Sequence, residues 1–174
     1  MEQKITSPIV KGVIITLLLI VYGLIIYFTG QMGNSTLSYL QYVILCGGII
    51  WSCVSFANQM KGNVTFGNVF GHGFKTTAIV AALILIYTFI AVKFLFPDMV
   101  DQAIAMTKTK MESQKNLSDE QIQQSLDMVK NNFLVFAVIG IVVGFAIIGA
   151  VSSLIGAALA KKNPKDPFAR TTQL

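Results

Sequence analysis

Four long apolar runs dominate this sequence and limit what the chain can fold into. They cover residues 9–28, 39–57, 76–96 and 133–160, and none of them contains Asp or Glu. Each run has about 20 residues or more, which is long enough for a helix to cross the hydrocarbon of a bilayer. Strands of a membrane barrel would alternate apolar and polar residues, and these runs do not. The runs therefore predict an all-α integral membrane protein with four transmembrane helices.

The composition excludes several classes of function. Only 12% of the residues are charged and 54% are hydrophobic, whereas a soluble domain carries about 25% charged residues. The formal charge is +5, but the chain has one arginine, Arg170, and its lysines scatter between the apolar runs. A nucleic-acid surface would gather them on one face. We expect a single membrane domain over residues 1–174, with the lipid bilayer as its partner and no nucleic acid.

The distribution of positive charge predicts an orientation. Eight of the thirteen Lys and Arg residues lie on the face with both termini and residues 58–75, and five lie on the other face. Positive residues are enriched on the cytoplasmic side of membrane proteins, so both termini are expected in the cytoplasm. Lys11 and Lys93 lie near span ends, and we expect their stems to extend along lipid toward the headgroups.

Residues 97–132 form the one sizeable polar segment and predict an extramembrane helical hairpin between helices three and four. Its first half begins with proline and an acid, which suit a helix start. In its second half, Ser118 and Gln121 form a capping-box pattern, and Leu117 and Ile122 are spaced as a hydrophobic staple. At about 1.5 Å per residue, the last apolar run would measure roughly 42 Å against about 30 Å of hydrocarbon. We expect its helix to protrude toward the hairpin.

The stretch at residues 58–75 carries three phenylalanines at four-residue spacing with glycines beside them. One interpretation is an interfacial half-helix that leads into span three, with its rings at the lipid boundary. The other is that the glycines allow close approach of a second helix or a ligand. The interfacial candidates are Phe66, Gly67, Phe70, Gly71, His72 and Phe74.

Residues that would carry chemistry are scarce. His72 is the only histidine and has no neighbouring acid or cysteine that would complete a metal site. Cys46 and Cys53 are seven residues apart, which is about 10.5 Å along a helix and exceeds the roughly 7 Å that a disulfide allows. We predict no catalytic, cofactor-binding or metal-binding residues, no cofactor, and a protein that is not an enzyme.

Small residues at four-residue spacing mark the last apolar run as a packing surface. In lipid, such residues let helices approach closely and gain van der Waals contact. They serve packing inside one bundle or association into a homo-oligomer equally well. The helix-packing candidates are Gly140, Gly144, Gly149, Ser153 and Gly156.

Four segments carry a resemblance that spans almost the whole chain. They read ITSPIVKGVIIT, FANQMKGNVTFGNVFGHGFKTT, FPDMVDQ and IGAVSSLIGAALAKKNP. The sequence resembles the bacterial domain of unknown function four-one-nine-nine, a family found mainly in Bacteroidota. The resemblance implies a multi-pass protein of the bacterial inner (cytoplasmic) membrane, and it carries no site residue over to this chain.

Two functions from different classes fit these features. The leading hypothesis is a non-enzymatic component that binds a protein partner or organises the membrane, since its distinctive features are surfaces and packing motifs. In that case the hairpin docks the partner outside the cytoplasm; otherwise its two apolar stripes only pack against each other. The alternative is a small oligomeric channel or uncoupled transporter, lined by Ser, Thr and backbone groups.

Overall fold

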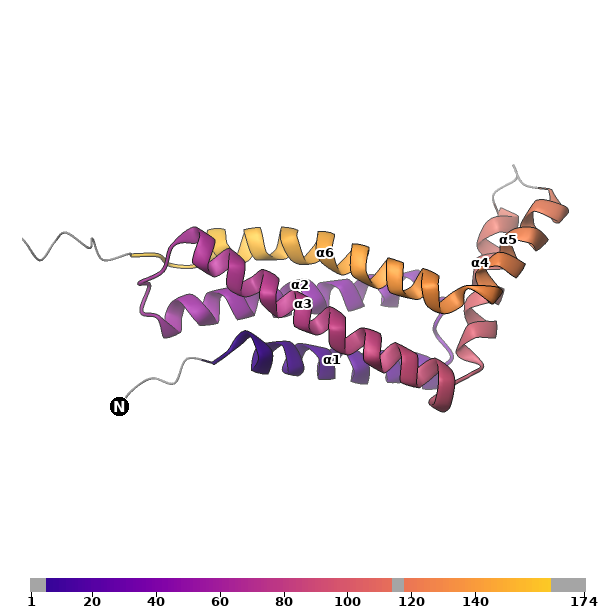
Figure 1. Ribbon diagram of the computed structural model, residues 1–174, viewed down its shortest axis with the longest axis horizontal. Coiled ribbons are helices and arrows are strands. Elements are labelled where there is room, and N and C mark those ends of the chain that lie inside the picture. The colour runs from indigo at the N-terminus through magenta and orange to yellow at the C-terminus, as the bar shows by residue number, and fades with distance from the viewer. Residues whose placement is uncertain (1–5, 114–117, 164–174) are drawn as a thin grey trace, which may run out of the picture. The chain divides into compact units, whose positions relative to one another are not determined.

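The computed structural model describes residues 6–113 and 118–163, and these residues form helices joined by short turns. Four of the helices are long and apolar enough to cross a membrane. The all-α class with four candidate membrane spans is therefore confirmed. The elements are α1 (Pro8–Phe28), α2 (Ser35–Gln59), α3 (Phe66–Ile90), the π-helical turn η1 (Ala91–Leu95), α4 (Met99–Ser113), α5 (Asp119–Asn131) and α6 (Phe133–Leu159) (Figure 1).

The helix that carries the third apolar run begins before that run. Helix α3 starts at Phe66, so residues 66–75 are its first turns and are continuous with the apolar run. Lys75 directly precedes the apolar run, but its side chain is exposed, and an exposed lysine does not interrupt a helix. The candidate span ends at Leu95, one residue from the predicted end at residue 96, but its π-helical last turn was not predicted. Helix α3 continues directly into η1, where the Phe96 amide donates to the Ala91 carbonyl at 2.7 Å.

The chain divides into two compact units. The first unit comprises residues 1–81 and 144–174, and thus holds α1, α2, the first part of α3 and the last part of α6. Within it, the Thr6 amide donates to Gln59 Oε1 at 2.8 Å, and the Asn163 amide donates to the Gly62 carbonyl at 2.7 Å. These bonds join the start of α1 to the end of α2, and the α2–α3 turn to the end of α6.

Glycines set the spacing between the helices of the first unit. A Cβ added at Gly48 of α2 would lie 2.8 Å from the side chain of Ile15 on α1. One added at Gly156 of α6 would lie 2.7 Å from Cβ of Cys53 on α2, and one at Gly149 would overlap the side chain of Thr77 on α3. Lipid provides no hydrophobic drive for helix association, so such close contact is the main source of attraction.

The second unit covers residues 82–143 and includes the end of α3, η1, α4, α5 and the start of α6. Helices α4 and α5 contact each other. The predicted capping box is confirmed: the Gln121 amide donates to Ser118 Oγ at 3.3 Å, and the Ser118 amide donates to Gln121 Oε1 at 3.0 Å. Leu117, predicted as part of a hydrophobic staple, lies outside the described residues.

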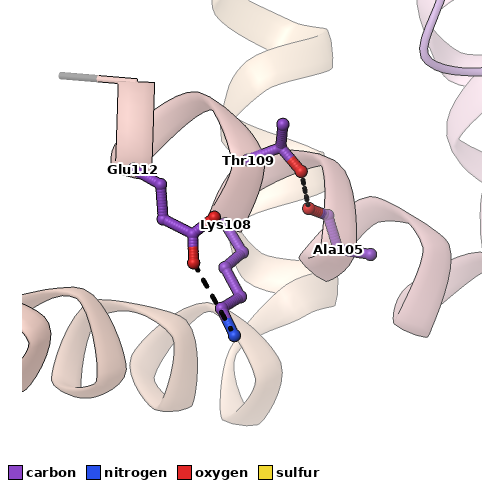
Figure 2. Close-up of polar contacts among 4 residues, drawn as sticks. All are labelled: Ala105, Lys108, Thr109 and Glu112. Carbon is purple, nitrogen blue, oxygen red and sulfur yellow. Dashed lines mark hydrogen bonds and ion pairs between the residues drawn. The ribbon is translucent and has the colours of Figure 1, made fainter.

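The surface of α4 is polar. Figure 2 shows its one ion pair among the described residues, between Lys108 Nζ and Glu112 Oε1 at 3.8 Å, and the hydroxyl of Thr109 donating to the Ala105 carbonyl at 3.1 Å. Helix α4 buries none of its residues, whereas α5 buries Ile122 and Leu126. That this helix pair stands outside the membrane as a hairpin stays a prediction.

Gly149→Ala tests the close packing of α6 on α3. The new Cβ would meet the β-branched Thr77, whose hydroxyl donates to the Gly73 carbonyl at 3.1 Å and so resists rotation. Overpacking of this kind costs about 1–3 kcal/mol, so the melting temperature in detergent should fall. Gly144→Ala is the matched control on the same helix, because a Cβ there would meet nothing within 4 Å. Equal melting of the two variants would contradict the packing described here.

Candidate membrane-embedded polar site

The first unit encloses a set of buried polar side chains that come from all four of its helices. Fully apolar surroundings make each such group expensive unless it is hydrogen-bonded. Polar groups inside a membrane span are rare, and they usually mark a functional site. We call this set the polar cluster; it consists of Lys11, Ser52, Cys53, His72, Thr76, Thr77, Ser152 and Ser153.

Lys11 is the only charged side chain in the polar cluster. It lies in the first turn of α1, is 1% exposed, and its Nζ donates to the Ser52 carbonyl of α2 at 3.1 Å. The prediction that its stem extends along lipid is therefore wrong. The buried face of α1 holds Lys11 together with Ile15 and Leu19, which follow at intervals of one helical turn, so the side chain enters the bundle.

No carboxylate accompanies the Lys11 ammonium. The sequence has no Asp or Glu from residue 3 to 97 or from residue 128 to 165, so the described part of the first unit contains none. An ammonium carries three N–H donors, and the bond to Ser52 uses one of them. Lys11 therefore places an uncompensated charge with spare donors inside the bundle.

A chain of hydroxyl groups continues from Ser52 into α3. Thr76 Oγ1 donates to the His72 carbonyl at 2.9 Å, and it lies 3.0 Å from Ser52 Oγ. A threonine hydroxyl has one proton to donate. Because that proton is directed to His72, the Ser52 hydroxyl must be the donor in the Ser52–Thr76 bond. The direction of donation thus runs from α2 into α3.

His72 is the aromatic member of the cluster and is buried against Phe56 of α2. Its ring stacks on that of Phe56, with centroids 4.2 Å apart and planes at 9°, and the residue is 6% exposed. Three buried polar atoms have no hydrogen-bond partner in the described structure: Nε2 of His72 and the Oγ atoms of Ser152 and Ser153. Orphaned buried polar groups are uncommon and each requires an explanation, such as strain, a ligand or water.

Cys53 and Gly73 bring α2, α3 and α6 together at the cluster. Cys53 Sγ donates to the Val69 carbonyl at 3.7 Å. A Cβ at Gly73 would overlap Cys53 Sγ and would lie 2.7 Å from Ser153 Oγ. The absence of a side chain at Gly73 therefore lets a thiol and a hydroxyl approach the α3 backbone from two other helices.

The interfacial candidates all lie on α3 but do not share one environment. Phe66, Gly67 and Phe74 are exposed, whereas Phe70 and Gly71 are intermediate and His72 is buried. Lys162 Nζ lies 5.6 Å from the centroid of the Phe66 ring and caps the end of α6 by donating to the Ala157 and Ala160 carbonyls. The placement of the interfacial candidates at the lipid boundary stays a prediction.

The packing candidates also separate into two groups. Gly149, Ser153 and Gly156 are buried, and each contacts α2 or α3. A Cβ at Gly140 or Gly144 would meet nothing within 4 Å, so these two glycines are not needed for the contacts described. Association of a second copy through them stays a prediction.

Sequence reasoning missed Lys11, Ser52 and Thr76 as members of one site. A signal was present in α1, where the buried positions include its lysine, a glycine and a threonine on one face. It was hard to recognise because Ile15 and Leu19 share this face, so apolar residues lie on both sides of α1. The described residues contain no group of three or more His, Cys, Asp or Glu that could hold a metal ion.

Lys11→Met should leave the protein as stable as before or more stable. The change keeps the apolar stem and removes the charge, and replacing buried ionic groups by apolar ones is often neutral or stabilising, by about 1–4 kcal/mol. We expect the melting temperature in detergent to stay constant or rise. Lys75→Met, at an exposed position of α3, should leave it unchanged. A fall confined to Lys11→Met would mean that the bond to Ser52 stabilises the fold more than the buried charge destabilises it.

Comparison with known proteins agrees with the resemblance seen in the sequence. No curated protein and no solved structure matches the chain. The family model described as "Protein of unknown function (DUF4199)" matches residues 11–162, a range that includes every member of the polar cluster. The chain therefore belongs to the DUF4199 family of proteins of unknown function.

Proposed function

We propose that this protein is a small channel or uncoupled transporter whose solute passes the polar cluster of the first unit. The observation that carries the proposal is Lys11, a lysine that is 1% exposed within a candidate membrane span and has no carboxylate near it among the described residues of the first unit. Ionisable residues inside membrane spans most often face a pathway for ions or substrates. This role was the alternative from the sequence, and the buried lysine is the reason to prefer it.

The energetic cost of Lys11 supports a functional role. Burial of an ion without a counter-charge costs several kcal/mol, and packing alone could be satisfied by an apolar side chain at this position. The three orphaned polar atoms of His72, Ser152 and Ser153 add to this cost. A bundle held only by packing would gain stability by losing these groups, so their presence favours a site that acts on a solute.

The chemistry of the cluster favours an anionic solute. Its ammonium and hydroxyl groups supply hydrogen-bond donors, and the described part of the first unit has no carboxylate that would attract a cation. Donors and positive charge in a pore select for anions. Lys11 would bind the anion, and the Ser152 and Ser153 hydroxyls would replace part of its hydration.

The proposal includes a location and an assembly. The family resemblance implies a bacterial inner membrane, and the asymmetry of Lys and Arg supports an orientation with both termini in the cytoplasm. The cluster would then lie about one to three helical turns from the cytoplasmic end of the bundle. A homo-oligomer is included because Gly140 and Gly144 leave a part of α6 free for close contact with a second copy.

A non-enzymatic role is part of the same proposal. The Cys53 thiol donates to a backbone carbonyl, and the Ser52 hydroxyl donates to Thr76, as shown above. A nucleophile needs a base within hydrogen-bond reach. Neither side chain is directed to an imidazole or a carboxylate in these bonds, which supports binding and passage of a solute over catalysis.

Anion flux into liposomes tests this function. Purified protein would be reconstituted with a chloride-sensitive dye inside, and chloride entry would be compared with entry into empty liposomes. We expect wild-type flux above background and Lys11→Met flux lower by about tenfold or more, because hydrogen bonds to a charged group contribute about 1.5–3 kcal/mol.

Lys75→Met is the matched control and should keep wild-type flux, since that lysine is exposed. Wild-type liposomes no more permeable to chloride than empty ones would refute the anion pathway. Equal flux through wild type and Lys11→Met would show that Lys11 is not on the path.

Partner binding, the leading hypothesis from the sequence, is kept as a second candidate because of one observation on the second unit. Helix α4 buries none of its residues, and Met128 of α5 is 54% exposed. Methionine suits adaptable binding surfaces. A protein partner that covers α4 and α5 would bury this surface, whether as a binding or as a membrane-organising contact.

A pull-down from native membranes in mild detergent tests the second candidate. The full chain with a C-terminal tag would be compared with a variant whose residues 98–130 are replaced by a short flexible linker. We expect a stoichiometric partner that is lost with the replaced segment. Recovery of the same proteins with both chains would remove the support for docking at α4 and α5.

A further inference from the structure

A second polar feature lies in the second unit and takes no part in the proposed pathway. It is a pocket of about 310 Å³ between η1, the start of α4 and the junction of α5 with α6. Lys93 and Lys130 line it, together with Asn131 and Asn132. Its remaining lining is apolar and includes Val92 and Phe133. The pocket therefore combines two cations with an apolar wall.

The two lysines have no counter-charge at this pocket. No Asp or Glu is among the lining residues, and neither lysine forms an ion pair in the described part of the chain, where Lys108 pairs with Glu112. Two unpaired ammonium groups that share one cavity repel each other, and like charges of this kind are stabilised by an anion between them. The pocket is therefore complementary to a negatively charged group.

The backbone around the pocket is specialised. Lys93 lies in η1, where the hydrogen bonds pass from the α to the π pattern, as the 2.7 Å bond from the Phe96 amide to the Ala91 carbonyl shows. A π turn contains one more residue than an α turn and so changes the direction of the side chains after it. Such turns are often found at functional sites, and this one contributes two lining residues.

The pocket falls at the ends of two candidate spans. Lys93 is two residues from the end of the span Phe66–Leu95, and Phe133 is the first residue of the span Phe133–Leu159. In a bilayer these positions correspond to the depth of the lipid phosphates, and lysines there can reach the headgroups. The apolar wall would face the glycerol and upper acyl region of the same lipid.

We propose that this pocket binds the phosphate headgroup of an anionic phospholipid, held between Lys93 and Lys130 with the asparagine amides as further donors. A lipid, rather than free phosphate, is the ligand because Val92 and the first residues of α6 provide contacts that only the apolar part of a lipid can use. The pocket residues belong to the second unit and the polar cluster to the first, so this proposal does not depend on the proposed transport function.

Native mass spectrometry of the full chain in detergent tests this site. The protein would be titrated with phosphatidylglycerol, with phosphatidylcholine of the same acyl chains, and with inorganic phosphate alone. We expect phosphatidylglycerol to bind more tightly than phosphatidylcholine. A lysine near an anionic lipid strengthens binding roughly fivefold, so the double variant Lys93→Gln/Lys130→Gln should bind it about 25-fold more weakly.

Lys108→Gln/Lys110→Gln is the matched control. It removes the same charge from exposed lysines of α4, including the one paired with Glu112 in Figure 2, and neither lysine lines the pocket. This variant should keep wild-type affinity. If the first double variant does not fold, each single variant should lose about fivefold.

Three results would overturn the site. Equal affinity for the two lipids would show that charge is not recognised. An equal loss in both double variants would reduce the effect to net charge. Tight binding of inorganic phosphate without preference for the lipid would assign the pocket to a free anion.

Discussion

The structure of the first unit depends on the close approach of its helices at small residues. Lipid solvates apolar side chains as well as a protein interior does, so helices in a membrane associate only where their surfaces fit closely. The side chain of Ile15 packs against Gly48, that of Thr77 against Gly149, and that of Cys53 against Gly156. Each contact joins a different pair of helices. Together they hold α1, α2, the first part of α3 and the last part of α6 in one bundle.

This close packing also explains the chemistry inside the bundle. In the hydrocarbon of a bilayer, a buried polar group needs a hydrogen-bond partner within the protein. Ser52 and Thr76 have such partners through hydroxyl and backbone hydrogen bonds. The Lys11 ammonium makes one hydrogen bond with its three donors, and Nε2 of His72 makes none in the described structure. The packing that stabilises the helices thus buries donors that the described residues do not use, which is the physical basis for binding an anion there.

The sequence predicts the helices well because their signals are local. Continuous apolar runs define the four spans, and the capping box at Ser118 begins α5 as its side-chain pattern indicates. The site is harder to predict because it depends on which face of each helix is turned inward. Around Lys11, apolar residues occupy both exposed and buried positions, so the presence of an apolar residue does not tell the two faces apart. The expectation that Lys11 extends along lipid toward the headgroups therefore placed its side chain on the wrong face of α1.

The burial of Lys11 is the central claim, and acylation of lysines measures it most directly. Protein in mild detergent would be treated with a water-soluble acylating reagent, and the modification of each lysine would be followed by mass spectrometry. Lys11, at 1% exposure, should remain almost unmodified while the exposed Lys75 and Lys161 react rapidly. Acylation of Lys11 as fast as that of Lys75 in the folded protein would place its amine at the surface and contradict the buried site.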